Sequence, residues 1–349
     1  MRLADYQFAS NNSLRGLSDS SVSERQRETT LGKPLLDVLP QPPKTMLEAF
    51  GLLMRVNAAI AVSIPVLCAA MLAWWETGAF NGLLFLFTCM GVLSTTMGLN
   101  ALSEYYEAQR FLKIQNRSTY SLTASYGLIH LKSIYPGTIK SLGIIALLIG
   151  FVCCVGVAFL SAWPILFFSG LGFFLAYAYA MPPIRYSYWG WGIGEIGLLL
   201  GYGILPALGS YYAQTQTISS LILWASIPFA LLSMLVFFQY NLLNRRRDWI
   251  IRKRTLAVIF GSNRAVDIGA VLIILTYVAL VLLVSISNLP LWTLICLATL
   301  PKALQVFAKI ERDLCLPVHG YLLYKACMQA AILGGLLFAA ALWADKFFG

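Results

Sequence analysis

Apolar segments about 20 residues long recur through most of the chain, and this recurrence limits the possible folds more than any other feature. A helix of about 20 apolar residues crosses the hydrocarbon core of a bilayer, where only helices and closed barrels satisfy every backbone polar group. We therefore predict an all-α polytopic membrane protein with nine transmembrane helices. The predicted spans are 50–74, 81–103, 136–160, 163–180, 194–212, 219–243, 264–286, 289–308 and 321–344.

The low content of charged residues supports this fold class. Charged residues make up 11% of the chain, whereas soluble domains carry about 25%. A net charge of +10 would suggest nucleic acid as a partner of a soluble chain. In a polytopic protein the same charge reflects basic cytoplasmic loops. We therefore expect the lipid bilayer, and no nucleic acid, as a partner.

Lys and Arg concentrate in alternate links between the predicted spans. The links on the other side carry no charge apart from Glu76. The positive-inside rule therefore places the basic links and the N-terminus in the cytoplasm, and we expect a bacterial cytoplasmic membrane. Residues 1–45 are rich in Ser and Arg without an apolar period, which predicts a mobile cytoplasmic tail before a membrane domain at 46–349. The basic links are 104–135, 181–193, 244–263 and 309–320.

One group of polar residues closes the second span. Asn100 and Glu104 are one helical turn apart, and Glu107 is a further neighbour of Glu104 on the helix surface. A second group follows the sixth span, where Asn241 and Asp248 stand at i and i+7. Asn244 lies between them at i+3, and three Arg follow it at 245–247, so we expect the amide and acid side chains to share one helix face.

These two groups suit the binding of a metal ion and a phosphate ester. Mg²⁺ takes oxygen ligands and usually bridges one or two carboxylates to substrate phosphates. Arg and Lys bind phosphate oxygens directly. A metal ion and a cationic clamp together stabilise the negative charge that develops on a departing diphosphate. The alternative is that these charges are solvated span ends, with the Arg cluster serving topology or anionic lipid.

An acid also lies inside a predicted span. Glu195 stands near the start of the fifth span, where an ionisable group is costly and often functional. We expect one of two roles for Glu195: it pairs with Arg185, or it lies near an aromatic acceptor.

Several segments, in this order along about 50–345, resemble the UbiA superfamily of intramembrane prenyltransferases, and most of all its MenA branch. The carriers are "RVNAAIAVSIPVL", "NALSEYYEAQR", "PPIRY" with "GWGIGE", "GSYYAQT" and "KRTLAV". The resemblance implies nine helices around a central cavity that opens sideways to lipid. It also implies Mg²⁺, a polyprenyl diphosphate donor and an aromatic acceptor such as 1,4-dihydroxy-2-naphthoate.

The resemblance assigns catalytic roles to four residues: Asn100 and Glu104 in the first motif, and Asn241 and Asp248 in the second. Arg185, Lys253 and Arg254 match basic positions near the diphosphate. The residues that we expect to bind substrate are Arg185, Asn244, Arg245, Lys253, Arg254, Glu107 and Glu195.

The acidic motifs are thinner than the family pattern. Ala101 stands where the first motif has an Asp, and Asn244 stands where the second motif has its first Asp. Fewer acids hold fewer metal charges. We therefore predict one Mg²⁺, bound by Glu104 and Asp248, with Arg side chains taking over part of the charge on the diphosphate.

Three functions remain open from the sequence. The first is transfer of a polyprenyl group to an aromatic acceptor. The second is an intramembrane terpene cyclase, and the third is a degenerate, non-catalytic isoprenoid-binding protein, which the missing acids favour. A transporter is a weaker alternative, because no clear repeat or broken helix with paired intramembrane charges is present.

Overall fold

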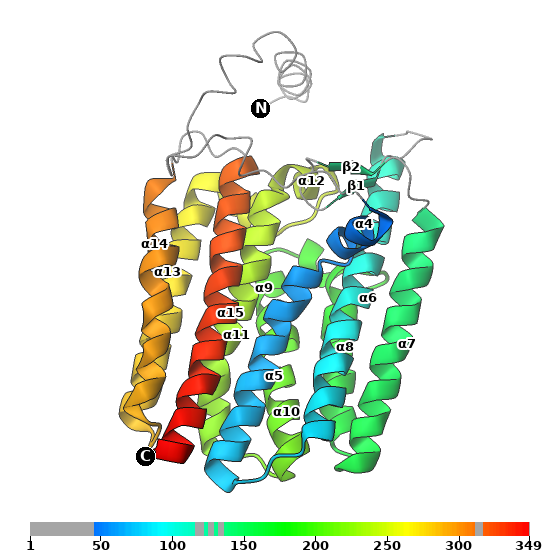
Figure 1. Cartoon of the computed structure of the whole chain (residues 1–349). Helices are drawn as coiled ribbons and strands as arrows, with labels where there is room; N and C mark the ends of the chain where they lie inside the picture. Colours follow the sequence, from blue (N-terminus) through cyan, green and yellow to red (C-terminus); the bar gives the residue numbers. More distant parts are fainter. Residues whose placement is uncertain (1–44, 116–121, 125–128, 132–135, 311–316, 349) are drawn as a thin grey trace.

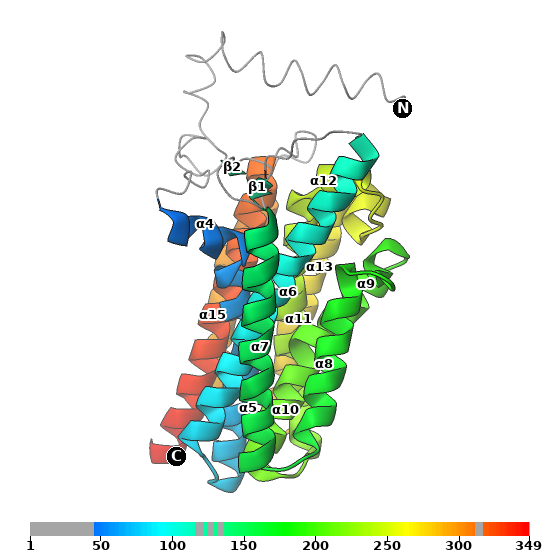
Figure 2. The same cartoon turned by 90° about the vertical axis from the view of Figure 1, so that its right-hand side faces the viewer.

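The computed structural model describes residues 45–115, 122–124, 129–131, 136–310 and 317–348. Apart from Thr45, the predicted mobile tail 1–45 lies outside the described residues. The described part is a bundle of helices that run along a common direction (Figures 1 and 2). In Figure 1, α4, α12, β1 and β2 lie at one end of the bundle and the C-terminus lies at the other.

The membrane-spanning elements follow the predicted apolar segments. Eight described helical segments are long and apolar enough to cross a membrane, and α8 is a shorter apolar helix. The elements that cross or nearly cross are α5 (Val56–Thr77), α6 (Gly82–Gln115), α7 (Pro136–Leu160), α8 (Ile165–Ala180), α9 (Ile193–Leu199) continuing through η2 (Leu200–Ile204) into α10 (Leu205–Thr215), α11 (Ser220–Leu243), α13 (Leu256–Ile286), η3 (Leu291–Thr299) with α14 (Leu300–Lys309), and α15 (Pro317–Phe348).

Short elements lie between these helices at the end that carries the polar motifs. They are α4 (Met46–Leu53), a two-stranded antiparallel hairpin of β1 (Leu122–Ala124) and β2 (Ile129–Leu131), η1 (Tyr186–Tyr188) and α12 (Arg245–Ile250). The hairpin was not expected from the sequence. Thr45 caps α4 by accepting a hydrogen bond from the Glu48 amide at 3.2 Å.

Several boundaries differ from the prediction: the first span, 50–74, is divided between α4 and α5, the seventh begins at Leu256 instead of 264, and two further differences concern the polar motifs. Helix α6 continues past residue 103 to Gln115, because the stretch after the apolar span lacks Gly or Pro and keeps good helix formers. The predicted helix face at 241–248 is interrupted, since α11 ends at Leu243 and α12 begins at Arg245. Asn244 stands at the junction with φ −94° and ψ 12°, outside the helical region.

The helices α5 and α11 are the most buried spans and form the centre of the bundle. Figure 1 shows α13 and α14 on one side of this centre, and α6, α7 and α8 on the other. Helices α6 and α7 approach very closely through glycine. A Cβ atom added to Gly98 would lie 2.7 Å from the Gly143 carbonyl oxygen, so the backbones pack without intervening side chains. This packing fixes α6, which carries the first polar motif.

Candidate active site

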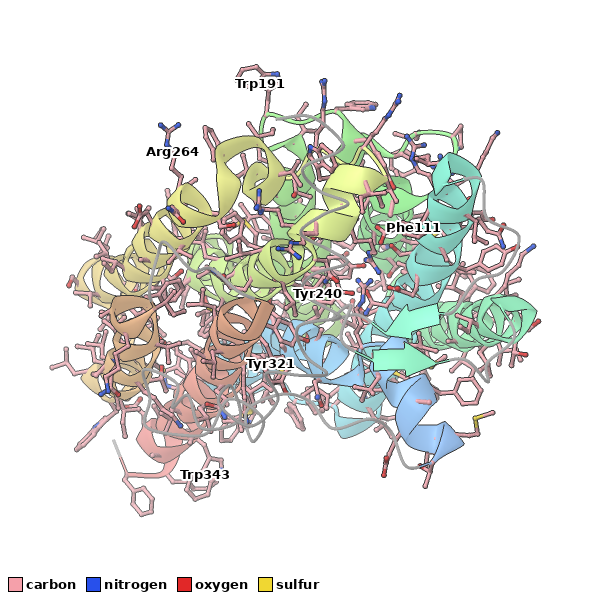
Figure 3. The ribbon with its side chains drawn as sticks, turned by 90° about the horizontal axis from the view of Figure 1, so that it is seen from above. Phe111, Trp191, Tyr240, Arg264, Tyr321 and Trp343 are labelled. Carbon is pink, nitrogen blue, oxygen red and sulfur yellow. The ribbon has the colours of Figure 1, made fainter. Side chains whose placement is uncertain are left out.

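The two polar motifs meet at the end of the bundle viewed in Figure 3, where Tyr240 lies near the middle. Glu104 and Glu107 project from α6, and Asp248 from α12, and all three are almost fully buried. Asn100 is buried one turn before Glu104. Buried carboxylates are costly unless they are paired, so the partners of these acids define the site.

Three cations pair with the two glutamates. Arg55 donates to Glu104 at 2.9 Å. Arg247 bridges both glutamates, with 2.6 Å to Glu107. Lys253 donates to Glu107 at 2.9 Å. Each of the four carboxylate oxygens of the two glutamates therefore has a cationic partner.

Burial and charge act in opposite directions on the cations of this cluster. Burial alone lowers the pKa of Lys253, but Asp248 and Glu107 raise it well above its usual value. Burial likewise lowers the pKa of Arg247, but Glu104 and Glu107, with Tyr240 and Asp248, raise it well above its usual value. Both side chains therefore remain protonated although they are buried.

Arg55 is a central member of the site that the sequence analysis did not single out. It adopts a left-handed conformation (φ 53°) between α4 and α5. Its guanidinium lies over the Tyr240 ring, 4.0 Å from the centroid, and reaches Asn100 Oδ1 at 3.5 Å. Its position inside the first predicted span, 50–74, was the available signal, because an ionisable residue within an apolar span is costly and often functional.

The second-motif acid differs from the two glutamates. Neither carboxylate oxygen of Asp248 has a hydrogen-bond partner, and the nearest cation, Lys253 Nζ, is 4.0 Å away. Burial raises the pKa of Asp248 to about 6. Of the acids that the two motifs supply, Asp248 is therefore the one whose oxygens remain open to a further ligand.

The three motif asparagines hold the surrounding elements. Asn100 donates to the Met54 carbonyl at 3.2 Å and so ties α6 to the α4–α5 junction. Asn241 exchanges hydrogen bonds with the Tyr179 hydroxyl, at 3.0 Å when Asn241 donates. Asn244 donates back to the Tyr240 carbonyl at 2.9 Å, where the helix is interrupted.

Glu195 lies apart from the ion-pair cluster. It accepts a hydrogen bond from the Leu256 amide at 2.9 Å and so connects α9 to the first turn of α13. Its second oxygen, Oε2, is buried without a hydrogen-bond partner. The expected pairing of Glu195 with Arg185 is absent from the ion pairs of the described residues.

Three other predicted residues also lie outside the cluster. Arg185 and Arg245 are half-buried and Arg254 is exposed, and none of them forms an ion pair within the described part of the chain. Of the three consecutive arginines at 245–247, Arg247 alone reaches the acids of α6. The fold brings seven residues together in the charged cluster: Arg55, Asn100, Glu104, Glu107, Arg247, Asp248 and Lys253.

The donor set limits how a metal ion would bind. Among the described residues, no three His, Cys, Asp or Glu side chains are grouped so as to hold a metal. Both oxygens of Glu104, one of the two predicted ligands, are already paired with arginine. Asp248 is open, and Mg²⁺ commonly uses one carboxylate together with substrate phosphates. Of the acids in the two motifs, Asp248 is thus the carboxylate that could take part in holding such an ion.

An apolar cavity of about 650 Å³ lies in the bundle, lined mainly by α6, α7, α8 and α10. Leu99, next to Asn100, and Tyr202 line its near end. Leu99 precedes Asn100 in α6, so this end of the cavity lies beside the charged cluster.

The fold and the site define an integral membrane protein with a charged cluster at one end of its helix bundle and an apolar cavity beside that cluster. The chain belongs to the UbiA prenyltransferase family, which matches residues 62–319. The predicted family and the predicted all-α membrane fold are thus confirmed.

Individual relatives support the same assignment. The chain is 24% identical to the 2-carboxy-1,4-naphthoquinone phytyltransferase of Synechocystis sp., over 71% of this chain and 77% of that protein. It is 25% identical to the 1,4-dihydroxy-2-naphthoate octaprenyltransferase of Bacillus subtilis, over 84% of this chain and 92% of that protein.

Solved structures share the fold. A UbiA homolog from Archaeoglobus fulgidus bound to GPP and Mg²⁺ superposes with a TM-score of 0.56 at 12% identity, covering 85% of this chain and 99% of that one. The apo structure of a UbiA homolog from Aeropyrum pernix gives the same TM-score at 14% identity, covering 82% and 97%.

Proposed function

We propose that this protein transfers a polyprenyl group from its diphosphate to an aromatic acceptor of the naphthoate type. The observation that carries the proposal is a buried cationic cluster with an apolar cavity beside it in the same helix bundle. The cluster fits a diphosphate and the cavity fits an isoprenoid chain. The family and the names of the relatives supply the reaction class and the kind of acceptor.

The cluster suits the charge changes of this reaction. The bond between the allylic carbon and the diphosphate oxygen breaks, and the bonding electrons leave with the diphosphate. Arg55, Arg247 and Lys253 stabilise the charge that accumulates on that leaving group. The acceptor ring then forms a carbon–carbon bond with the allylic carbon and loses a proton.

We propose that two aromatic rings beside the cluster stabilise the allylic carbon as it becomes cationic. Tyr240 already lies under the Arg55 guanidinium, and the Tyr179 ring lies 4.9 Å from Lys253 Nζ. When the diphosphate takes these cations as its own partners, the faces of the two rings can stabilise positive charge on the prenyl group. Asn241 holds the Tyr179 hydroxyl and so fixes the orientation of that ring.

Asp248 is the residue that we propose to hold Mg²⁺, together with phosphate oxygens of the donor. The bound ion would supply additional positive charge to the departing diphosphate. We propose that Glu104 and Glu107 act mainly by positioning the cations. Arg185, Asn244, Arg245, Arg254 and Glu195 remain proposed substrate contacts at the outer part of the site.

We further propose that the charged end of the bundle and the N-terminus face the cytoplasm of a bacterial cell. The support is the concentration of Lys and Arg in the links at that end. Single cysteines at exposed positions Arg252 and Ile286, in a chain whose own cysteines are replaced, should react with a membrane-impermeant maleimide from opposite sides. Labelling of both from one side would contradict the proposed topology.

The direct test uses the protein in lipid nanodiscs with geranylgeranyl diphosphate, 1,4-dihydroxy-2-naphthoate and Mg²⁺. We expect pyrophosphate release and a prenylated naphthoquinol in equal amounts. An Asp248→Asn variant is expected to lose most of the activity, and Arg246→Ala, at an exposed neighbouring position, is expected to retain it. Pyrophosphate with a hydrocarbon product would indicate a cyclase. Binding of the diphosphate without turnover would indicate a non-catalytic isoprenoid-binding protein.

A further inference from the structure

Arg110 lies close to the charged cluster but is not one of its seven members. It stands on α6, one turn after Glu107, and its side chain is half-buried. Its Nε–H donates a hydrogen bond of 2.7 Å to the backbone carbonyl of Ile251, which directly follows α12. Phe111, the next residue of α6, is labelled in Figure 3. Arg110 therefore ties the end of α6 to the segment that carries the second polar motif.

The turn between α12 and α13, residues 251–255, reverses the chain sharply. The Lys253 amide donates to the Asp248 carbonyl at 2.8 Å, and Arg252 adopts a left-handed conformation with φ 60°. This is the arrangement of a Schellman motif, in which one residue of positive φ ends a helix. Such a conformation costs free energy in a residue other than glycine. The hydrogen bond from Arg110 acts on the residue just before Arg252, so it supports the turn where the backbone is least favourable.

The same turn determines where two members of the charged cluster stand. Asp248 belongs to α12, and Lys253 is the second residue after Ile251. The Lys253 ammonium is 2.9 Å from Glu107 Oε1 and 4.0 Å from Asp248 Oδ2. Helix α6 thus holds the turn at two points, because Glu107 contacts the Lys253 side chain and Arg110 contacts the backbone two residues earlier.

A second contact connects Arg110 to the segment before α9. Its guanidinium lies over the ring of Tyr188, 4.7 Å from the centroid. Tyr188 ends η1, and the carbonyl of the preceding Ser187 accepts a hydrogen bond from the Arg254 amide at 3.2 Å. Arg110 therefore lies where α6, η1 and the turn between α12 and α13 meet. A planar guanidinium suits this junction, since its face stacks on a ring while its edge donates to a carbonyl.

We propose that Arg110 is a positioning residue for the diphosphate end of the site. It holds the turn between α12 and α13 against α6, so that Lys253 and Asp248 stand in place for an isoprenoid diphosphate. This inference rests on the proposed prenyl transfer and adds a residue that acts through the groups that contact the donor. A direct cationic contact with the diphosphate, or a contribution to stability alone, would give different results on substitution.

Two substitutions separate the hydrogen bond of Arg110 from its charge. Arg110→Gln keeps an N–H donor at the same number of bonds from Cα as Nε, but it removes the positive charge. Arg110→Met has a similar length without a donor. Arg246→Met is the matched control, because it removes an exposed arginine from α12. The affinity for the donor is measured in nanodiscs by displacement of labelled geranylgeranyl diphosphate, and thermal unfolding establishes that each variant is folded.

We expect Arg110→Met to weaken donor binding about tenfold or more, since loss of a residue that orients a ligand-binding group commonly has an effect of this size. Arg110→Gln should recover most of the affinity, and Arg246→Met should bind like the wild type. In turnover, the KM for the donor should rise in Arg110→Met while the KM for the acceptor stays unchanged. Equal losses in the Gln and Met variants would show that the charge itself contacts the diphosphate and would overturn the proposal. Wild-type affinity in Arg110→Met would overturn it as well.

A double-mutant cycle tests whether Arg110 acts through Lys253. Donor affinity is compared in Arg110→Met, Lys253→Met and the double variant, all in chelator so that Mg²⁺ makes no contribution. Residues that share one network show non-additive effects, whereas independent residues add. We expect the loss caused by Arg110→Met to shrink to about twofold or less when Lys253 is already replaced. A loss of the same size in both backgrounds would overturn the proposal. If Lys253→Met does not fold, the comparison of Arg110→Gln with Arg110→Met decides alone.

Failure of the proposed function is distinguishable from failure of this inference. If the wild-type protein binds the diphosphate without turnover, only the proposed transfer fails, and the affinities still decide the role of Arg110. If turnover proceeds and Arg110→Met binds the donor like the wild type, only the inference fails. If the wild-type protein binds no isoprenoid diphosphate, both fail together.

Discussion

Replacement of Arg247 by alanine tests the central feature of the site. This side chain bridges Glu104 and Glu107 and is 16% exposed. Its removal leaves Arg55 and Lys253 as the remaining partners, and it frees one carboxylate oxygen on each glutamate. Removal of one partner from a buried ion pair costs about 3 kcal/mol or more, because the remaining charge is uncompensated. We therefore expect the free energy of unfolding to fall by about 3 kcal/mol, with a Tm lower by roughly 6 °C.

The same substitution should increase the response to Mg²⁺. In the native cluster the arginine occupies one carboxylate oxygen of each glutamate, so we expect added Mg²⁺ to act mainly at Asp248. In the Arg247→Ala variant those oxygens are available. At a free Mg²⁺ concentration ten times Kd, binding adds about 1.4 kcal/mol of stability, which would restore roughly half of the loss.

The assay is thermal unfolding of the purified protein in detergent, followed by intrinsic fluorescence, in chelator and over a MgCl₂ titration. Arg246→Ala serves as the control, because it removes an exposed Arg from the neighbouring position. A Tm of Arg247→Ala equal to that of the control would show that the ion-pair network contributes little to stability. A lower Tm with no greater Mg²⁺ response than the wild type would refute the idea that Arg247 stands in the place of a metal ion.

Three further predictions concern single contacts. Burial raises the pKa of Asp248 from 3.8 to about 6, so in chelator the folded protein keeps a proton that the unfolded chain loses. The free energy of unfolding should therefore fall as pH rises from about 4 to 6. The same pH titration of the Asp248→Asn variant should not show this fall. Glu195→Ala should lower the free energy of chemical unfolding by about 1 to 3 kcal/mol, because the Leu256 amide loses its acceptor. The Glu195→Gln variant keeps an acceptor and should be close to wild type. Equal losses in the two variants would show that the charge of Glu195 matters and the hydrogen bond does not. Gly98→Leu should prevent a stable fold, because the added side chain meets the Gly143 carbonyl oxygen. The failure should be visible as aggregation on size-exclusion chromatography. A monodisperse variant with the wild-type Tm would contradict the close packing of α6 against α7.

The sequence predicted the membrane fold and the approximate positions of the eight spanning segments and the shorter apolar helix α8 found in the described part of the chain. It did so because the length and apolarity of a span are local properties that the bilayer imposes on each segment separately. It also predicted that Asn100, Glu104 and Glu107 lie together, since residues one turn apart on a helix are neighbours whatever the helix packs against. The length of α6 was underestimated, because apolarity marks where lipid ends and not where a helix ends.

The partners of the polar residues followed only from tertiary structure. Arg55 enters the site through a left-handed turn between two helices, and Arg247, unlike the two arginines before it, faces α6 after the interruption at Asn244. Glu195 bonds to the start of α13 and not to Arg185. Arg247 and Glu107 are 140 residues apart in the chain, so their contact depends on how whole helices pack. The sequence thus determined which chemical groups stand at each helix end, and the packing of the helices decided that most of the acids are paired with arginine and lysine and that Asp248 is open.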